Sequence, residues 1–93
     1  MKNFKLDDFL EILTVTELKN LCRNVDVVQY GNKSDITKRI VDKLSDDFVE
    51  FLLNCDLEHY EKLADYWEIE YPDNKSITKA DLFYRSIAHY FDN

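Results

Sequence analysis

Apolar residues recur along this chain at the three- and four-residue spacing of amphipathic helices. The longest pattern runs through Val15, Leu18, Leu21, Cys22 and Val25, and shorter ones precede and follow it. Together they predict six helices, near residues 6–13, 15–25, 33–44, 46–54, 57–67 and 79–91. A single glycine and a single proline in 93 residues are too few for the tight turns of an all-β fold. We therefore expect an all-α protein.

The apolar pattern occurs twice in succession. Residues 7–13 match residues 46–52, the stripe that begins at Val15 returns 42 positions later at Leu57, and residues 33–39 return 46 positions later as 79–85. The offset grows between matching blocks, where loops are expected, and a period of about 40 residues is the mark of a duplicated unit. We predict a single domain over residues 1–93, with one three-helix repeat at 6–44 and a second at 45–93.

Polar residues at the expected helix starts follow the same register. Thr14 and Glu17 have the spacing of a capping box, and Asp56 opens the matching helix of the second repeat. Asn32 and Thr78 each precede an aspartate by three residues and open the third helix of each repeat. Between the second and third helices, residues 27–28 and 69–71 are expected to be extended. Each repeat is therefore a helix followed by a helix–extended connector–helix hairpin.

The leading helix of each repeat is too short to be stable alone, so it must pack against its counterpart. We expect the junction between the repeats to contain Phe9, Ile12, Phe48 and Phe51. In the second repeat the apolar stripe places three aromatic residues in the core: Tyr60, Trp67 and Phe91. Ser86 takes the position of Ile40, which predicts looser packing there.

The hairpin of the first repeat, formed by residues 13–22, Val27, residues 31–36 and residues 39–40, resembles a SAP-type motif. Residues 60–69 and 78–82 resemble the same motif, or the related LEM-like hairpin, in a looser form. The resemblance implies a DNA-associated protein that contacts the nucleic-acid backbone through the connector and the start of the last helix. Other hairpins of this shape bind only proteins. A fainter similarity, in length and helix number, is to death-fold-like adaptors.

Charge is distributed unevenly over the two repeats. The net charge is −7, with +1 on residues 1–44 and −8 on residues 45–93. Four bases around the third helix are the candidates for phosphate contact: Lys33, Lys38, Arg39 and Lys43. Lys33 lies in the first turn, beside free amides that suit an anion. The alternative is that these bases form ordinary helical ion pairs, such as Asp35–Arg39 and Lys38–Asp42.

The second repeat combines acids with tyrosines that lie off the apolar stripe. The candidate protein-binding residues are Tyr66, Tyr71, Tyr84, Asp65, Glu68 and Glu70. Tyrosine provides contact area at low entropic cost, and the acids would attract a basic partner. The alternative is a solvated acidic face on which tyrosines cover the edge of the core. The same acids could also imitate a phosphate backbone in the DNA-binding groove of another protein.

Catalytic and metal-binding motifs are missing from the sequence. It has no glycine-rich phosphate loop, and neither the two cysteines nor the two histidines have the spacing of a metal site. We expect no enzymatic activity, no cofactor and no metal. Cys22 and Cys55 are expected to be reduced thiols, with Cys22 on the buried apolar stripe. No apolar run is long enough to span a membrane and no signal segment is recognisable, so an intracellular location, cytoplasmic or nuclear, is expected.

These observations predict a non-catalytic binding module of a DNA-associated system. The first SAP-like repeat would lie near nucleic acid, and the acidic second repeat would bind a protein. The alternative is an interaction protein without nucleic-acid contact, either an acidic adaptor or a DNA-mimic inhibitor of the small phage or death-fold-like kind. The sequence pattern sets no oligomeric state.

Overall fold

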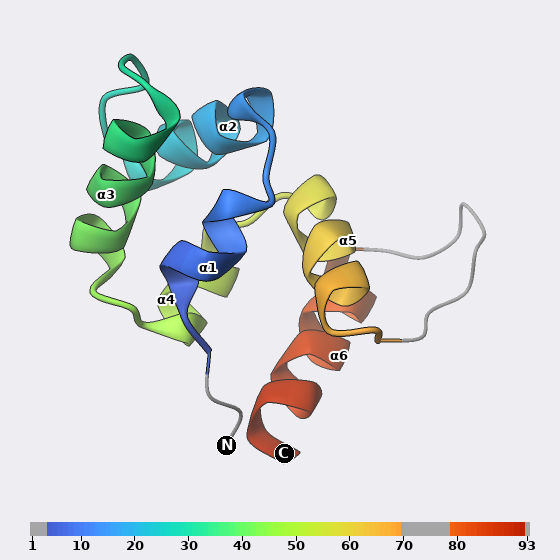
Figure 1. Ribbon diagram of the computed structural model, residues 1–93. Helices are drawn as coiled ribbons and strands as arrows, with labels where there is room; N and C mark the ends of the chain where they lie inside the picture. Colours follow the sequence, from blue (N-terminus) through green and yellow to red (C-terminus); the bar gives the residue numbers. More distant parts are fainter. Residues whose placement is uncertain (1–3, 70–78, 93) are drawn as a thin grey trace.

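The computed structural model describes residues 4–69 and 79–92, and in these ranges all regular structure is helical. Six helices follow one another in the order α1 (Leu6–Glu11), α2 (Val15–Val25), α3 (Lys33–Leu44), α4 (Phe48–Leu53), α5 (Leu57–Tyr66) and α6 (Lys79–Asp92). The predicted all-α class and helix order are therefore confirmed. In Figure 1, α2 and α3 form a hairpin on one side, α5 and α6 form a second on the other, and α1 and α4 lie between them.

Side-chain caps set the starts of α2 and α3. In α2 the Thr14 amide donates to Glu17 Oε1 at 2.8 Å, and the Glu17 amide donates to Thr14 Oγ1 at 3.1 Å, which completes the expected capping box. In α3 the Asp35 amide donates to the Asn32 side chain at 2.8 Å. These predicted starts are confirmed, whereas Thr78 lies outside the described residues.

The ends of α2 and α5 have the same geometry at positions 42 residues apart. Asp26 and Glu68 both adopt a left-handed conformation, with φ of 61° and 56°. The next amide in each case reaches back five residues, from Val27 to the Cys22 carbonyl at 3.0 Å and from Ile69 to the Ala64 carbonyl at 2.8 Å. This pattern is the Schellman helix end. It agrees with the proposed duplication, which stays an interpretation of the sequence.

Three helices are shorter than predicted: α5 lacks only Trp67, which is its C-terminal cap, and local backbone geometry explains the larger differences in α1 and α4. The first ends at Glu11, because Thr14 must be extended (φ −72°, ψ 163°) to cap α2. The fourth begins at Phe48 instead of 46, because Asp46 has a φ of 58° and Asp47 is the cap that accepts a hydrogen bond from the Glu50 amide.

The first half of the chain, residues 4–44, and the second half, from residue 45 onward, meet at a junction rich in aromatic residues. Phe9, Phe48 and Phe51 are buried as predicted, and the rings of Phe9 and Phe51 lie 5.5 Å apart edge to face. Ile12 was expected at the same junction, but this prediction is wrong. It is the C-terminal cap of α1, where the chain turns toward α2, and its side chain is 44% exposed. Phe4, which the helical pattern did not include, packs against Phe48 at 4.9 Å instead.

The core prediction for the second half is partly correct. Tyr60 is buried, and Trp67 is half-buried with its ring 5.3 Å from that of Phe48. Phe91, however, is 48% exposed, so its predicted core position is wrong. The adjacent Tyr90 stacks on Phe48 at 4.1 Å instead. Neighbouring residues of a helix point about 100° apart, so α6 directs only one of this pair toward the core.

Candidate functional site

Two of the four candidate phosphate-binding bases are engaged within the fold. The Lys33 ammonium donates to the Glu11 carbonyl at 2.5 Å and so satisfies the C-terminal end of α1. Arg39 Nη1 donates to the Val28 carbonyl at 3.3 Å and to the Tyr30 carbonyl. The Arg39 guanidinium also lies over the Tyr30 ring, 5.7 Å from its centroid. Both bases therefore brace the first half of the chain.

The other two bases are exposed, and they do not share one surface. Lys38 lines a groove of about 290 Å³ between α1 and α3, together with Asp7 and Glu11. Lys43 lines a separate hollow of about 480 Å³ between α3 and the connector, the segment of residues 26–30 that follows α2. Arg39 shares this connector hollow with Lys43, and acids lie at its rim as well. The two exposed candidate bases therefore lie at two separate sites, and each site also contains acids.

The predicted protein-binding residues are distributed over α5, its C-terminal end and α6. Asp65 and Glu68 are exposed, and Tyr66 is 43% exposed with its ring 5.7 Å from that of Phe9. Tyr84 is more exposed and packs edge to face on Phe83 of its own helix at 5.6 Å. The other two predicted residues, Tyr71 and Glu70, lie outside the described residues. Acids and partly exposed tyrosine therefore meet at the end of α5, while Tyr84 lies on another helix.

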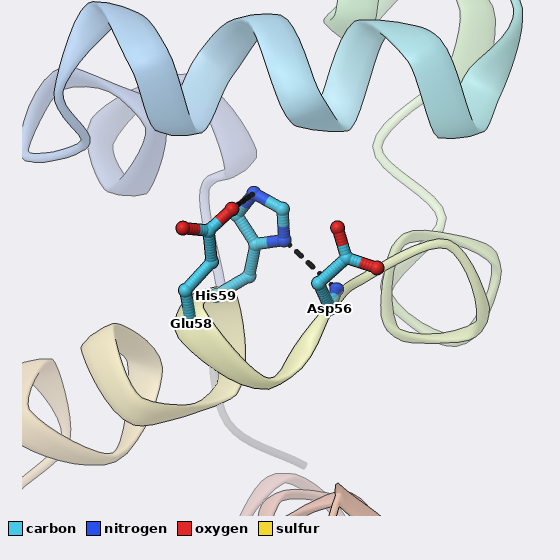
Figure 2. Close-up of side chains that lie close together, drawn as sticks. All are labelled: Asp56, Glu58 and His59. Carbon is cyan, nitrogen blue, oxygen red and sulfur yellow. Dashed lines mark hydrogen bonds and ion pairs between the residues drawn. The ribbon is translucent and has the colours of Figure 1, made fainter.

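The junction of α2 and α5 is the one place in the described ranges where three potential metal ligands meet. Ligand atoms of Asp56, Glu58 and His59 lie within 4.8 Å of one another. Figure 2 shows the His59 ring rising from the start of α5 toward α2, with the two acids on either side. The Asp56 amide donates to His59 Nδ1 at 2.9 Å, and His59 Nε2 lies 2.8 Å from the Glu17 carbonyl oxygen.

These hydrogen bonds define the tautomer of His59. A carbonyl oxygen only accepts, so Nε2 carries the proton and donates, while Nδ1 accepts from the amide. Both ring nitrogens are thus engaged, and a metal ion could bind only if one of these buried hydrogen bonds were broken. Glu58 is engaged too, because its Oε1 accepts from the Asn20 side chain at 2.7 Å. The cluster is therefore a polar contact between α2 and α5, and its geometry does not suit a metal centre.

The two thiols belong to the core. Cys22 and Cys55 are free and buried. Burial raises the pKa of the Cys22 thiol, and it raises that of Cys55 well above its usual value; the Cys55 thiol donates to the Phe51 carbonyl at 3.3 Å. Burial likewise raises the pKa of the Tyr60 hydroxyl, which donates to the Leu52 carbonyl. Groups held in the protonated form are poor nucleophiles, so none of them suits covalent chemistry.

Two residues with a clear structural role, one exposed and one buried, had no place among the predicted site residues. Tyr30 is 75% exposed and lies next to the connector hollow through its contact with Arg39. His59 joins the two halves at a position that corresponds to Glu17 in the repeat register. Tyr30 could have been noticed in the sequence, because it is an aromatic residue directly before Gly31. His59 could not, because a lone histidine on an apolar helix face gives no sign of its partner.

Comparisons with known proteins add no relative. No protein-family model, curated protein or solved structure matches the chain. Among the described helices, none is long and apolar enough to cross a membrane.

Proposed function

We propose that this chain is a non-catalytic binding module, and that its acidic second half binds a basic region of a protein partner. The observation that carries the proposal is that the two halves differ in which charged side chains are free to meet a partner. Lys33 and Arg39 of the first half are engaged with backbone carbonyls, whereas Asp65 and Glu68 at the end of α5 are exposed beside Tyr66. The net charge of −8 on residues 45–93 attracts cations and repels phosphates.

The chemistry of the described residues also supports a non-catalytic role. The nitrogens of His59 are occupied by hydrogen bonds, and burial raises the pKa of both thiols. Tyr66 offers the contact area that a charged surface needs, because charge steers association more than it stabilises the complex. The resemblance of the hairpins to SAP-type motifs places DNA-handling proteins among the partners to be expected.

A pull-down from native extract tests the proposal. The bait proteins are the wild type, a double variant Asp65→Asn/Glu68→Gln, and a control Asp7→Asn/Glu11→Gln that removes two exposed acids from the first half. We expect a basic partner that the wild type and the control retain, that the double variant loses, and that dissociates as salt rises. A set of bound proteins that is the same for all three baits would contradict the proposal.

Nucleic-acid contact by the first half is a second candidate, favoured by the exposure of Lys38 and Lys43. Helix α3 carries four bases and two acids, a local charge of +2 in a protein of −7. A gel-shift assay with duplex and single-stranded DNA at about 50 mM salt tests it, because phosphate contacts weaken steeply as salt rises. Lys38→Glu/Lys43→Glu should abolish the shift and Lys19→Glu should not. Absence of a shift with the wild type would exclude this candidate.

A further inference from the structure

We infer that the outer side of α6 is a self-association surface, on which the α6 helices of two copies of this chain pack antiparallel. This surface is separate from the acidic surface proposed above, which lies at the end of α5. It consists of four apolar residues that the fold leaves exposed: Ala80, Tyr84, Ala88 and Phe91. Tyr84 is 69% exposed and Phe91 is 48% exposed.

These four residues form one stripe along the helix. They are four, four and three positions apart, so they lie within an arc of about 80° on the helix surface. Leu82 and Ser86, the buried residues of α6, lie on the opposite side of the helix. That side packs against the fold, where α5 is the main neighbour (Figure 1). Helix α6 therefore has two apolar sides, and the single chain covers only one of them.

The order of large and small residues along the stripe is self-complementary. When a second α6 runs antiparallel to the first, Ala80 faces Phe91 of the second copy, and Tyr84 faces Ala88 of the second copy. The midpoints of these two pairs coincide to within half a residue, about 0.75 Å along the helix axis. One two-fold axis at this level therefore generates both contacts twice. Each ring then meets a methyl group, the large-against-small arrangement by which packed helices interdigitate.

Charge favours a second copy over a strongly charged partner at this surface. Helix α6 carries the bases Lys79 and Arg85 and the acids Asp81 and Asp92, so its charges cancel. Two copies of the helix therefore have no net repulsion between them. The whole chains, at −7 each, do repel at longer range, and salt screens that repulsion. Self-association should therefore strengthen as salt rises, whereas binding of a basic partner to the acidic surface should weaken.

The two exposed rings are held in place before a second copy arrives. Tyr84 lies edge to face on Phe83 at 5.6 Å, and Phe91 lies edge to face on Tyr90 at 5.0 Å. Phe83 and Tyr90 in turn pack against the core. Association therefore loses little affinity to the ordering of these side chains.

The size of the surface sets the expected affinity. An aromatic side chain buries about 150–250 Å², so the exposed parts of the four rings in a pair amount to roughly 500 Å². This is well below the roughly 1,200 Å² of a stable protein interface. We therefore expect a weak dimer with a Kd of about 10–500 μM.

Sedimentation equilibrium of the intact protein from about 10 μM to about 1 mM tests the inference. The mean mass should rise from that of one chain toward that of two, and it should do so at lower concentration in about 0.5 M salt than in about 0.05 M. Tyr84→Ser and Ala88→Glu should each weaken association about tenfold or more. Tyr30→Ser, which changes an exposed tyrosine of the first half, serves as the control and should associate as the wild type does.

A mixture of two variants tests the antiparallel arrangement. Tyr84→Lys and Ala88→Glu each disturb the contact between these positions, and antiparallel packing places the new lysine of one variant opposite the new glutamate of the other. The mixed pair should therefore associate at least about threefold more tightly than either variant does with itself. Parallel packing would bring each position next to its own copy, and the mixture would then gain nothing.

Several results would overturn the inference: a single-chain mass up to about 1 mM, association that Tyr84→Ser and Ala88→Glu leave unchanged or that Tyr30→Ser abolishes, and association that weakens with salt. A monomeric chain whose Tyr84→Ser variant loses a captured protein would assign the stripe to that partner instead. Circular-dichroism melting separates loss of association from loss of folding. Because the changed side chains are exposed, each variant should melt close to the wild type.

Discussion

Replacing His59 with leucine tests the packing of the two halves against each other. The imidazole is completely buried, accepts a hydrogen bond from the Asp56 amide, and donates one to the Glu17 carbonyl. Leucine has a similar volume but forms neither hydrogen bond. The substitution therefore leaves a helix-start amide and a backbone carbonyl without a partner at the α2–α5 contact, while it largely avoids creating a cavity.

The expected loss follows from these two groups. A buried hydrogen bond contributes a net 0.5–1.5 kcal/mol, and a buried polar group left unpaired costs about 1–3 kcal/mol. Since the small apolar gain of leucine offsets part of this, we expect His59→Leu to lower the free energy of unfolding by about 2–4 kcal/mol. A domain of this size has a total of about 5–14 kcal/mol. The variant should therefore melt about 10–20 °C below the wild type.

Urea unfolding followed by circular dichroism and by Trp67 fluorescence measures this difference. Glu61→Gln, at an exposed position of the same helix, serves as the control and should stay within about 0.5 kcal/mol of the wild type. Glu17→Gln should also change little, because it keeps the backbone carbonyl that His59 bonds and a side-chain oxygen that can accept from the Thr14 amide, and its ion contact of 4.0 Å to Lys62 is weak. A loss below about 0.5 kcal/mol for His59→Leu would refute the view that these hydrogen bonds hold the halves together.

Three further predictions concern stability. Glu68 has a φ of 56°, so Glu68→Gly should raise the free energy of unfolding by about 0.5–1 kcal/mol in urea titrations, whereas Glu68→Ala, which keeps a Cβ, should not. The Ser86 hydroxyl is buried without a hydrogen-bond partner among the described residues, so Ser86→Ala should raise the melting temperature; a decrease would show that the hydroxyl is satisfied. Burial raises the pKa of Cys55 in the folded state, so its contribution is complete below the unfolded-state value of about 8.5 and is lost as pH rises above it. Urea titrations under reducing conditions at about pH 8 and about pH 9.5 should show this loss, with a smaller pH dependence in Cys55→Ala.

The helices of this protein were predictable because local rules determine them. The apolar spacing along α2 and the cap at Thr14 concern residues within a few positions of one another, and the structure reproduces both. The wrong predictions lie where two local preferences conflict. The helical pattern extends through Ile12, but the extended conformation that Thr14 needs to cap α2 ends α1 earlier. At Phe91, two adjacent aromatic residues competed for one core position, and only three-dimensional packing decides between them.

The candidate site was less predictable, because its decisive contacts join residues far apart in sequence. The sequence offered Lys33 and Arg39 as phosphate-binding candidates, with solvent-exposed charges in ordinary helical pairs such as Asp35–Arg39 as the alternative. In the structure both reach backbone carbonyls outside their own helix, 22 residues away for Lys33 and 9 or 11 for Arg39. Carbonyl positions depend on how the chain folds back on itself, and side-chain identity does not reveal them. The same holds for His59, whose partner carbonyl is 42 residues away.

The two hairpins of the fold are joined through buried groups on either side of α1 and α4. The connector hollow belongs to the α2–α3 hairpin and the acidic surface to the end of α5, and these hairpins lie on opposite sides of α1 and α4 (Figure 1). The aromatic contacts of Phe9 and Phe51 and the hydrogen bonds of His59 join the two sides through buried groups. A partner on one side therefore need not obstruct a partner on the other.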